Sequence, residues 1–478
     1  MTLKTLHTDV AIIGAGTAGM TAYRAALDHT ERVLVIEGGP YGTTCARVGC
    51  MPSKLLIAAA EAAHAIAGAP AFGVHAGPPR VDGRAVMDRV RRERDRFVGF
   101  VVDAVERWPE ARRLRGHARF VDDHTLEVDG HTRVVADRIV IATGSSPAVP
   151  PPWREALGEL LVVNDDVFDW QDLPRSVAVV GTGVIGLELA QALHRLGVRV
   201  TLYGRGGRIG PLTDPTLQAL CGELFAAEMP MRADAHGLVL RRDGDEVVVE
   251  QDGQPAARFD RLLAATGRRP HAATLGLAST SLPLDPAGIP VFDRRTGQIG
   301  VSNVFIAGDV GELHPLLHEA ADDGRIAGDN AGRFPDVRVR PRRAPLAVVF
   351  SDPQIMRAGC GHAELVDAGT GFETGRVSFA EQGRSRVMGV NRGALHVYGE
   401  RATGRFLGAE MVGPAAEHIG HLLAWSAQRG DTVQQMLDSP FYHPVIEEGL
   451  RTALRDLQRA LRMGPPPVEQ CLECGPGA

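Results

Sequence analysis

The sequence predicts an α/β fold in which one supersecondary unit occurs twice, followed by a separate α+β domain. A short apolar strand, a glycine-rich turn, a helix and a second strand follow one another near residue 8 and again near residue 176. Each copy is later followed by a strand that runs into Ala-Thr-Gly. From about Ala344, alternating strands mix with a helix. We therefore expect two Rossmann-like dinucleotide-binding domains and a C-terminal α+β domain.

The first copy begins with the β-branched apolar run 8–13, which is typical of a buried strand. Ala/Leu-rich and amphipathic segments follow it and predict helices. We read the many arginines of the second long helix as a solvated face. The expected elements are a helix over 17–28, a strand over 32–36, helices over 53–66 and 85–108, and a strand over 137–144.

The second copy follows a proline-rich stretch, 147–153, which we interpret as a linker. Its expected elements are strands over 176–180 and 199–203, a helix ending near Leu196, and a strand over 262–267. A buried strand is expected over 301–310. In the α+β domain we expect strands over 346–350 and 394–398 and a helix over 415–429, with a mobile tail over 464–478.

Composition excludes several classes of protein. The 478 residues carry a net charge of -6, whereas a nucleic-acid-binding protein usually has a basic excess. No apolar run approaches the roughly 20 residues needed to span a bilayer, and the N-terminal residues lack the pattern of a secretory signal. We therefore expect a cytoplasmic protein with no nucleic-acid or membrane partner.

The first glycine motif is Gly14-x-Gly16-x-x-Gly19, and Glu37 stands 18 residues after its last glycine. Glycines at this spacing let the backbone approach a pyrophosphate at a helix N-terminus, where free N–H groups favour negative charge. A carboxylate at the end of the next strand can accept both ribose hydroxyls. The complete pattern predicts a dinucleotide site.

The second glycine motif is Gly181-x-Gly183-x-x-Gly186, and the same count of 18 reaches Gly204 instead of an acid. Arg205 and Arg208 follow. Guanidinium groups suit the 2′-phosphate of NADPH, because arginine binds phosphate in a fork geometry. We favour NADPH over NADH, while a flexible turn with solvent-facing arginines is the alternative.

Six cysteines are too few for a disulfide scaffold in a chain of this length. Cys45 and Cys50 are separated by four residues at the expected start of a helix, which stabilises a thiolate. A zinc site would need further ligands nearby, so we expect a redox pair and no metal. Cys221 and Cys360 are isolated, and we expect both to be small buried hydrophobes.

The segment Cys45-(x)4-Cys50-Met-Pro-Ser-Lys54 resembles the active-site signature of the flavoprotein disulfide reductases, which include dihydrolipoamide dehydrogenase and glutathione reductase. The resemblance extends to about residue 460. It implies FAD in the first fold, contacted by the first glycine motif, Glu37 and Asp309 of VFIAGDV, and a nicotinamide nucleotide in the second. The remaining cofactor-binding candidates are Lys54 and the glycine turns with Thr143, Gly144 and Gly267.

The resemblance also implies the catalytic roles. Cys50 would be the sulfur beside the flavin and Cys45 the sulfur that attacks the substrate. Lys54 and Glu188 would form an ion pair beside the reactive flavin atoms. His443 and Glu448 match a His-Pro…Glu motif, in which the histidine is the acid and base for thiols and the glutamate orients it. That histidine would enter the site from the other subunit of a homodimer.

We expect FAD-binding segments over 1–150 and 269–343, an NAD(P)-binding domain over 151–268, a dimerisation domain over 344–462 and a tail over 463–478. The substrate would be a small dithiol or disulfide: lipoamide oxidised in the dehydrogenase direction, or an oxidised thiol reduced by NADPH. The tail pair Cys471 and Cys474 could relay electrons, bind a metal as a carrier, or be inert.

Overall fold

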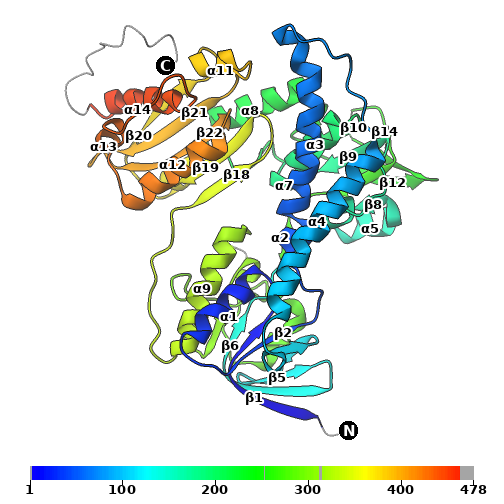
Figure 1. The fold of residues 1–478 in the computed structure, drawn as a ribbon, viewed down its shortest axis with the longest axis vertical. Helices are drawn as coiled ribbons and strands as arrows, with labels where there is room; N and C mark the ends of the chain where they lie inside the picture. Colours follow the sequence, from blue (N-terminus) through cyan, green and yellow to red (C-terminus); the bar gives the residue numbers. More distant parts are fainter. Residues whose placement is uncertain (1–2, 252, 312–314, 463–478) are drawn as a thin grey trace.

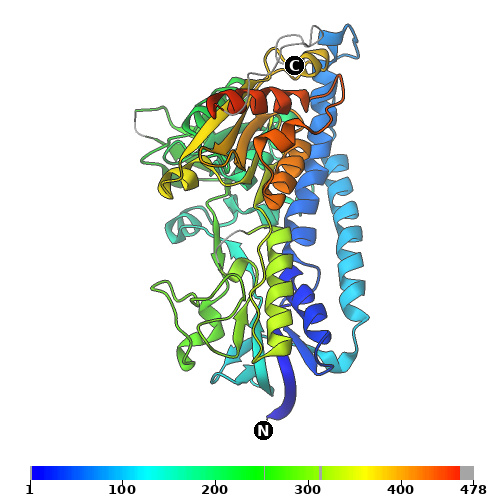
Figure 2. The same ribbon diagram turned by 90° about the vertical axis from the view of Figure 1, so that its left-hand side faces the viewer.

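The computed structural model describes residues 3–251, 253–311 and 315–462. These residues form three bodies and a helical arm (Figure 1). Figure 2, turned by 90°, shows that the two long helices of the arm run side by side along one flank of the molecule. The prediction of two α/β units followed by a separate α+β domain is therefore confirmed.

The first body is a seven-stranded sheet in the order β3-β2-β1-β6-β5-β4. The seventh strand, β17, pairs with the last three residues of β6, whereas β5 pairs with its first four. Strands β1, β2, β3, β6 and β17 pair in parallel, and Val10, Ala11 and Ile12 of β1 are fully buried because both faces of a parallel sheet are covered. The strands are β1 (Lys4–Ile13), β2 (Val33–Glu37), β3 (Arg113–Arg115), β4 (Ala118–Phe120), β5 (Thr125–Val128), β6 (Thr132–Ile141) and β17 (Val304–Ile306).

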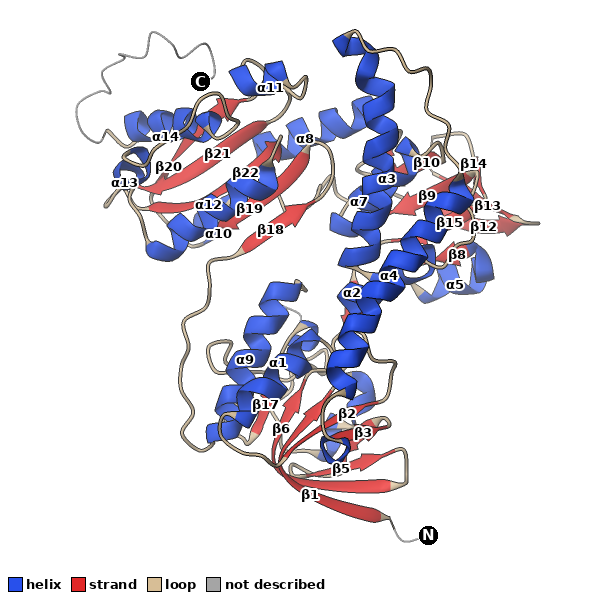
Figure 3. Cartoon of the chain, in the orientation of Figure 1, coloured by secondary structure: helices blue, strands red, loops and turns tan. Residues whose placement is uncertain are grey.

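Helices α1 (Thr17–Leu27) and α9 (Leu317–Arg333) cross closely beside this sheet (Figure 3). A Cβ atom on Gly324 or Gly328 of α9 would stand 2.2 Å from a backbone oxygen of α1. The two helices can approach this closely only because both positions are glycine. The segment that returns after the second body thereby completes the first body.

The second body repeats the arrangement with a five-stranded parallel sheet in the order β11-β10-β9-β15-β8. Its sheet strands are β8 (Leu161–Val162), β9 (Ser176–Val180), β10 (Arg199–Tyr203), β11 (Met231–Arg232) and β15 (Arg261–Ala264). Its helices are α5 (Pro151–Leu157), α6 (Asn164–Val167), α7 (Val184–Arg195) and α8 (Pro215–Glu228). An antiparallel sheet, β12 (Val239–Asp243), β13 (Glu246–Glu250) and β14 (Ala257–Phe259), and the pair β7 (Ser145–Pro147) and β16 (Arg268–Pro270) are added.

The third body is an antiparallel sheet in the order β18-β19-β22-β21-β20 with helices packed against it. The strands are β18 (Leu346–Val349), β19 (Gln354–Gly359), β20 (Phe372–Ser378), β21 (Ala394–Glu400) and β22 (Phe406–Gly413). The helices are α10 (His362–Asp367), α11 (Gly383–Val387), α12 (Ala416–Arg429), α13 (Val433–Leu437) and α14 (Glu448–Ala460).

Short 3₁₀ turns occur before the third body begins. They lie at Ala69–Phe72, Glu110–Arg112, Gly158–Leu160, Ala273–Leu275, Leu277–Ser279 and Asp309–Gly311.

The arm consists of α2 (Thr44–Val48), α3 (Cys50–Gly68) and α4 (Gly83–Glu106). Residues Thr44–Phe72 are helical, long and apolar enough to cross a membrane by length and composition alone, although Lys54 and Glu61 interrupt the apolar run. This is weak evidence for a span, because a core helix of a soluble protein passes the same test. Leu56, Ile57, Ala60 and Ala63 form a buried face of α3, which packs against α4 and α7.

Two expectations need correction. The proline-rich stretch 147–153 is not wholly a linker, because α5 begins at Pro151, and proline is favoured in the first turn of a helix. The strand expected over 301–310 is only Val304–Ile306. After it the chain turns at Gly308 (φ 78°) and continues as a 3₁₀ turn that starts at Asp309.

Candidate active site

Each glycine of the first motif is required for a different physical reason. Gly14 has φ 109°, and a Cβ there would stand 2.3 Å from the carbonyl oxygen of Ala142. A Cβ on Gly19 would stand 1.9 Å from the oxygen of Gly14, so helix and strand meet only through glycine. Gly16 has an ordinary extended backbone and no neighbour within 4 Å of its Cβ position. Its glycine leaves open space at the N-terminus of α1, where a pyrophosphate fits.

The first turn is bordered by Glu37 at the end of β2. Its carboxylate accepts hydrogen bonds from the backbone N–H groups of Ala15 (2.8 Å) and Gly39 (2.7 Å), which fixes it beside the turn. Thr143 and Gly144 follow β6, whose carboxyl end lies at the same edge of the sheet. Ser145 donates to Asp309 Oδ2 at 2.8 Å. These residues would hold FAD in the crevice beyond the strand ends, where such folds bind dinucleotides.

The second motif has the same construction. Cβ atoms on Gly181 and Gly186 would stand 2.1 Å and 1.8 Å from backbone oxygens, whereas Gly183 has no neighbour within 4 Å. The end of the following strand differs, because a Cβ on Gly204 would stand 2.4 Å from the oxygen of Ala233. A carboxylate side chain therefore does not fit where the first fold has Glu37. Gly267, at φ 110°, ends the Ala-Thr-Gly turn after β15.

The arginines that follow Gly204 are exposed. Arg205 and Arg208 lie in the loop after β10, and no ion pair is recorded for either side chain among the described residues. Asp234, whose Oδ1 accepts from the N–H of Gly206 at 2.7 Å, lies next to this loop and was not predicted from the sequence. The surface beyond β10 therefore presents the guanidinium groups of Arg205 and Arg208 together with the neighbouring carboxylate of Asp234.

The cysteines lie on two helices instead of one helix start. Cys45 is in the five-residue α2, and Cys50 is the first residue of α3. The chain breaks between them at Gly49 (φ -128°, ψ -117°), where a Cβ would stand 3.1 Å from Cys45 Cα. Thr43, at φ 51°, caps α2 by accepting from the N–H of Ala46 at 3.2 Å.

The two sulfurs differ in acidity. The Cys45 thiol donates a hydrogen bond to Cys50, and this bond lowers the pKa of Cys50 to about 7. Surrounding protein atoms, which exclude water, raise that pKa, while the Lys54 ammonium lowers it. The same hydrogen bond, reinforced by burial, raises the pKa of Cys45. Near neutral pH the reduced pair therefore holds a thiolate at Cys50 and a thiol at Cys45.

Lys54 and Glu188 are brought together. Lys54 Nζ lies 2.6 Å from Glu188 Oε2, and the carboxylate is 4% exposed. The other oxygen of Glu188 accepts from the N–H of Phe350 at 2.9 Å, and Nζ lies 4.6 Å from the centre of the Phe350 ring. Phe350 follows β18, so the arm, the second body and the third body meet at this ion pair.

His443 and Glu448 are also brought together, at the N-terminus of α14. His443 Nδ1 lies 3.0 Å from Glu448 Oε2, and Arg451 donates to Glu448 Oε1 at 3.0 Å. The carboxylate is 2% exposed, whereas the imidazole side chain is 64% exposed. An Nδ1–H tautomer leaves Nε2 directed outward as a base. The structure does not bring His443 to the cysteines within one chain, because α13 and α14 lie at the outer edge of the third body, whereas α2 lies near the middle of the molecule (Figure 1).

Of the remaining cysteines, the structure describes Cys221 and Cys360. Cys221 is buried as expected, and burial raises its pKa to about 12. Cys360 is exposed, so the expectation of a buried residue is wrong there: it lies directly after the last residue of β19, where the chain leaves the sheet. Cys471 and Cys474 lie outside the described residues. No group of three His, Cys, Asp or Glu side chains suited to a metal is found within 3–251, 253–311 and 315–462.

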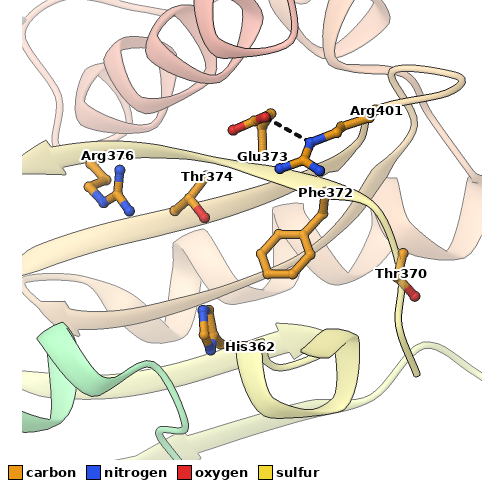
Figure 4. Close-up of a pocket in the computed structure, with 7 residues that line it drawn as sticks. All are labelled: His362, Thr370, Phe372, Glu373, Thr374, Arg376 and Arg401. Carbon is orange, nitrogen blue, oxygen red and sulfur yellow. Dashed lines mark hydrogen bonds and ion pairs between the residues drawn. The ribbon is translucent and has the colours of Figure 1, made fainter. Parts of the chain in front are cut away.

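A polar cavity of about 290 Å³ lies in the third body and contains none of the predicted site residues (Figure 4). Arg401 donates to Glu373 at its rim at 2.8 Å. Its lining residues are His362, Thr370, Phe372, Glu373, Thr374, Arg376 and Arg401. The cysteine centre is therefore a separate feature of the molecule.

Several residues at the site carry no signal in a single sequence. Phe350 acts through its backbone N–H and its ring, and Ser145 through one hydroxyl. Arg268 donates to Ser145 Oγ at 2.8 Å and lies 3.9 Å from Asp309. Asn164 donates to the loop between the cysteines. Of these residues, only Arg268 could have suggested a cofactor contact, because it directly follows the Ala-Thr-Gly turn.

Comparison with known proteins agrees with this geometry. Residues 8–324 match the family model of the pyridine nucleotide-disulphide oxidoreductases, and residues 346–454 match the dimerisation domain of that family. Mercuric reductase of Shigella flexneri is 32% identical over 472 residues, covering 95% of this chain and 81% of the relative. Dihydrolipoyl dehydrogenase of Thermus scotoductus is 31% identical over 470 residues, covering 94% and 97%.

Solved structures share the fold. The HOCl-induced flavoprotein disulfide reductase RclA from Escherichia coli has a TM-score of 0.79 at 23% identity, covering 96% of this chain and 100% of that one. LpdA from Mycobacterium tuberculosis has a TM-score of 0.78 at 24% identity, covering 94% and 99%. The matched family consists of enzymes that use FAD and NAD(P)H, and its dimerisation domain supports a homodimer. The chain thus belongs to the flavoprotein pyridine nucleotide-disulphide oxidoreductases.

Proposed function

We propose that this enzyme exchanges two electrons between NADPH and a small-molecule disulfide through Cys45 and Cys50. The observation that carries the proposal is the placement of the two sulfurs: Cys45 in α2 and Cys50 at the start of α3 flank the break at Gly49, and α3 also carries Lys54, paired with Glu188 at 2.6 Å. In keeping with this placement, the pKa of Cys50 is lowered to about 7, while that of Cys45 is raised. Cys50 is thus the sulfur that ionises first, and Cys45 keeps its proton until a base removes it. Disulfide exchange needs this division of roles.

FAD, held by the first glycine turn, Glu37 and Asp309, would supply the two-electron link between nicotinamide and cysteines. In the reductive direction the Cys45–Cys50 bond opens and takes up two electrons and one proton, leaving a Cys45 thiol and a Cys50 thiolate. Deprotonated Cys45 attacks one substrate sulfur, and the first product leaves as a thiol. Cys50 thiolate then attacks Cys45, which restores the bridge and releases the second product.

The protons would move through the imidazole of the partner subunit. His443 of the partner subunit takes the proton of Cys45 and gives it to the first departing thiolate, and the second departing thiolate takes up a proton from solvent; Glu448 of the partner subunit holds Nδ1. Lys54, paired with Glu188, places a positive charge beside the two cysteines and lowers the pKa of Cys50.

The proposal includes the domain organisation and the location of the enzyme. FAD would be bound by residues 1–150 and 269–343, the nicotinamide nucleotide by 151–268, and the dimer would form through 344–462. We propose a cytoplasmic location.

The second nucleotide site supports NADPH. Gly204 leaves no room for the carboxylate that an unmodified ribose would need, and Arg205 and Arg208 are exposed beside it. Two guanidinium groups can bind a 2′-phosphate. Asp234, close to Gly206, opposes this choice and makes the nucleotide preference worth measuring first.

A steady-state screen tests the proposal. NADPH and NADH are each combined with lipoamide, oxidised glutathione and larger disulfides. We expect NADPH to be preferred, and Arg205→Ala with Arg208→Ala to raise the KM for NADPH at least about tenfold while leaving the KM for NADH unchanged. The screen also combines NAD⁺ with dihydrolipoamide. Faster turnover of that pair than of NADPH with any disulfide would instead assign the dehydrogenase direction.

A second candidate is reduction of a metal ion. It is favoured by the relatives named mercuric reductase and by the Cu(II) complex of RclA. A metal ion needs no protonated leaving group, so the paired His443 and Glu448 weigh against it. Hg(II) and Cu(II) are included in the screen, with and without residues 465–478. Loss of function only on this truncation would favour the tail pair as carrier or relay.

A further inference from the structure

The loop between the two cysteines is held from outside by Asn164. This residue begins α6 in the second body and is 5% exposed. Its Nδ2 donates to the carbonyl oxygen of Val48 at 2.9 Å and to Asp165 Oδ1 at 2.9 Å. Both neighbours are acceptors, which requires the amide nitrogen at this position. Val48 ends α2, between Cys45 and Cys50.

The sequence of the loop explains why an external donor is needed. In a continuous α-helix, the carbonyl of Val48 would accept from the N–H of the fourth residue along. That residue is Pro52, which has no N–H. The chain also leaves helical geometry at Gly49. The amide of Asn164 therefore supplies a hydrogen bond that the segment Val48–Pro52 cannot make for this carbonyl from its own helix.

Helix α2 depends on contacts at both of its ends. Five residues are too few for a helix to be stable alone. At its N-terminus Thr43 Oγ1 accepts from Ala46, and at its C-terminus Asn164 holds Val48. Next to Asn164, the guanidinium charge of Arg47 on α2 acts on Asp165. α6 thus anchors the segment that contains Cys45 to the nucleotide-binding second body.

We propose that Asn164 is a positioning residue that keeps Cys45 and Cys50 within reach of each other as their bond opens and closes. This inference rests on the proposed function of the pair. A fixed loop keeps the effective concentration of one sulfur toward the other high, and a loose loop lowers it. Asn164 acts on the cysteines only through the backbone of Val48.

Two substitutions in the FAD-loaded enzyme test this role. Asn164→Asp keeps the shape and removes the donor, and Asn164→Leu removes it without adding charge. In the two-electron-reduced enzyme, the long-wavelength absorbance of the Cys50 thiolate is titrated with pH. We expect its midpoint to rise by about one pH unit in both variants, because a loose loop weakens the Cys45–Cys50 hydrogen bond. Disulfide turnover should fall about ten- to a hundredfold.

The matched control is Asn303→Asp. Asn303 Nδ2 also donates to a backbone carbonyl, that of Asp137 at 2.7 Å, but in the first body. This variant should keep the wild-type midpoint and turnover. NADPH-to-quinone transfer, which does not need the cysteines, should change less than about twofold in all three variants.

The outcomes separate the two levels of inference. Wild-type midpoints and turnover in both Asn164 variants would overturn the positioning role. Equal loss of quinone and disulfide activities would also overturn it, because Asn164 would then be needed only for folding. A wild-type enzyme with neither thiolate absorbance nor disulfide turnover would instead overturn the proposed function itself.

Discussion

The site consists of two centres that share one design and differ in direction. In the sulfur centre, made of Cys45, Cys50, Lys54 and Glu188, a buried carboxylate holds the ammonium at 2.6 Å. In the imidazole centre, made of His443, Glu448 and Arg451, a buried carboxylate holds Nδ1 at 3.0 Å. The sulfur centre joins three parts of the chain, whereas the imidazole centre is one local loop with an exposed ring. The first is formed within one chain, whereas the second has an exposed imidazole that lies apart from the cysteines of its own chain.

Removing the attacking sulfur should have the largest effect. Cys45→Ser is expected to lower disulfide turnover by at least about a thousandfold, because a serine hydroxyl is not ionised near neutral pH. NADPH-to-quinone transfer should continue. Cys360→Ser, at an exposed cysteine outside both centres, is the control and should match the wild type. Disulfide turnover by the Cys45 variant would show that the sulfur centre is not the reacting one.

Removing the imidazole should come next. His443→Gln is expected to lower disulfide turnover about a hundred- to ten-thousandfold, the usual contribution of a general acid and base. The thiolate absorbance of Cys50 should remain, since the two centres lie apart in one chain. His75→Gln, an exposed histidine in a loop, serves as the comparison. Equal losses in the two variants would argue against a role for the imidazole centre.

The two carboxylates should separate the centres. Glu448→Gln is expected to lower disulfide turnover about tenfold and to spare quinone reduction, because only the orientation of His443 suffers. Glu188→Gln releases the Lys54 ammonium and the Phe350 N–H, so both activities should fall. The two reactions are measured side by side for each variant. If both substitutions gave the same ratio of losses, the division into two centres would be wrong.

The smallest effect concerns pH. Because the pKa of Cys50 is about 7, its thiolate absorbance should grow as pH rises through 7 and fade below it. Lys54→Met removes a charge that lowers this pKa, so the midpoint should move to higher pH. The reduced enzyme is titrated anaerobically by absorbance, with Arg401→Met, at the cavity of the third body, as the control for loss of a cation. A midpoint that moves downward would contradict the assigned electrostatics.

Much of the fold was predictable because its signals are local. The duplicated glycine turns reflect contacts that any Cβ would prevent, as at Gly19 and Gly186. The strands at Ser176–Val180 and Arg199–Tyr203 have the predicted bounds because buried parallel strands are continuous apolar runs. The separate helix of Cys45 was not predicted, since the break at Gly49 depends on packing against Cys45 itself.

The sequence predicted that Lys54 pairs with Glu188 and that His443 pairs with Glu448. It did not predict the residues that hold these pairs in place. Glu188 is held by a backbone N–H at Phe350, which any residue type could supply. Asn164 lies 116 positions from Val48, and an asparagine at the start of a short helix is common. Cys360 was expected to be buried by residue type alone, although its place after a strand end left it exposed. Tertiary contacts of this kind leave no pattern in one sequence.

Subunit mixing tests most directly whether the two centres act across a dimer. Cys45→Ser and His443→Gln enzymes are combined under conditions that exchange subunits, and disulfide turnover is followed. Each mixed dimer would contain one intact sulfur centre facing one intact imidazole centre, so random exchange should restore about a quarter of wild-type turnover. Turnover that stays at the level of the separate variants, after exchange has been verified, would contradict the account.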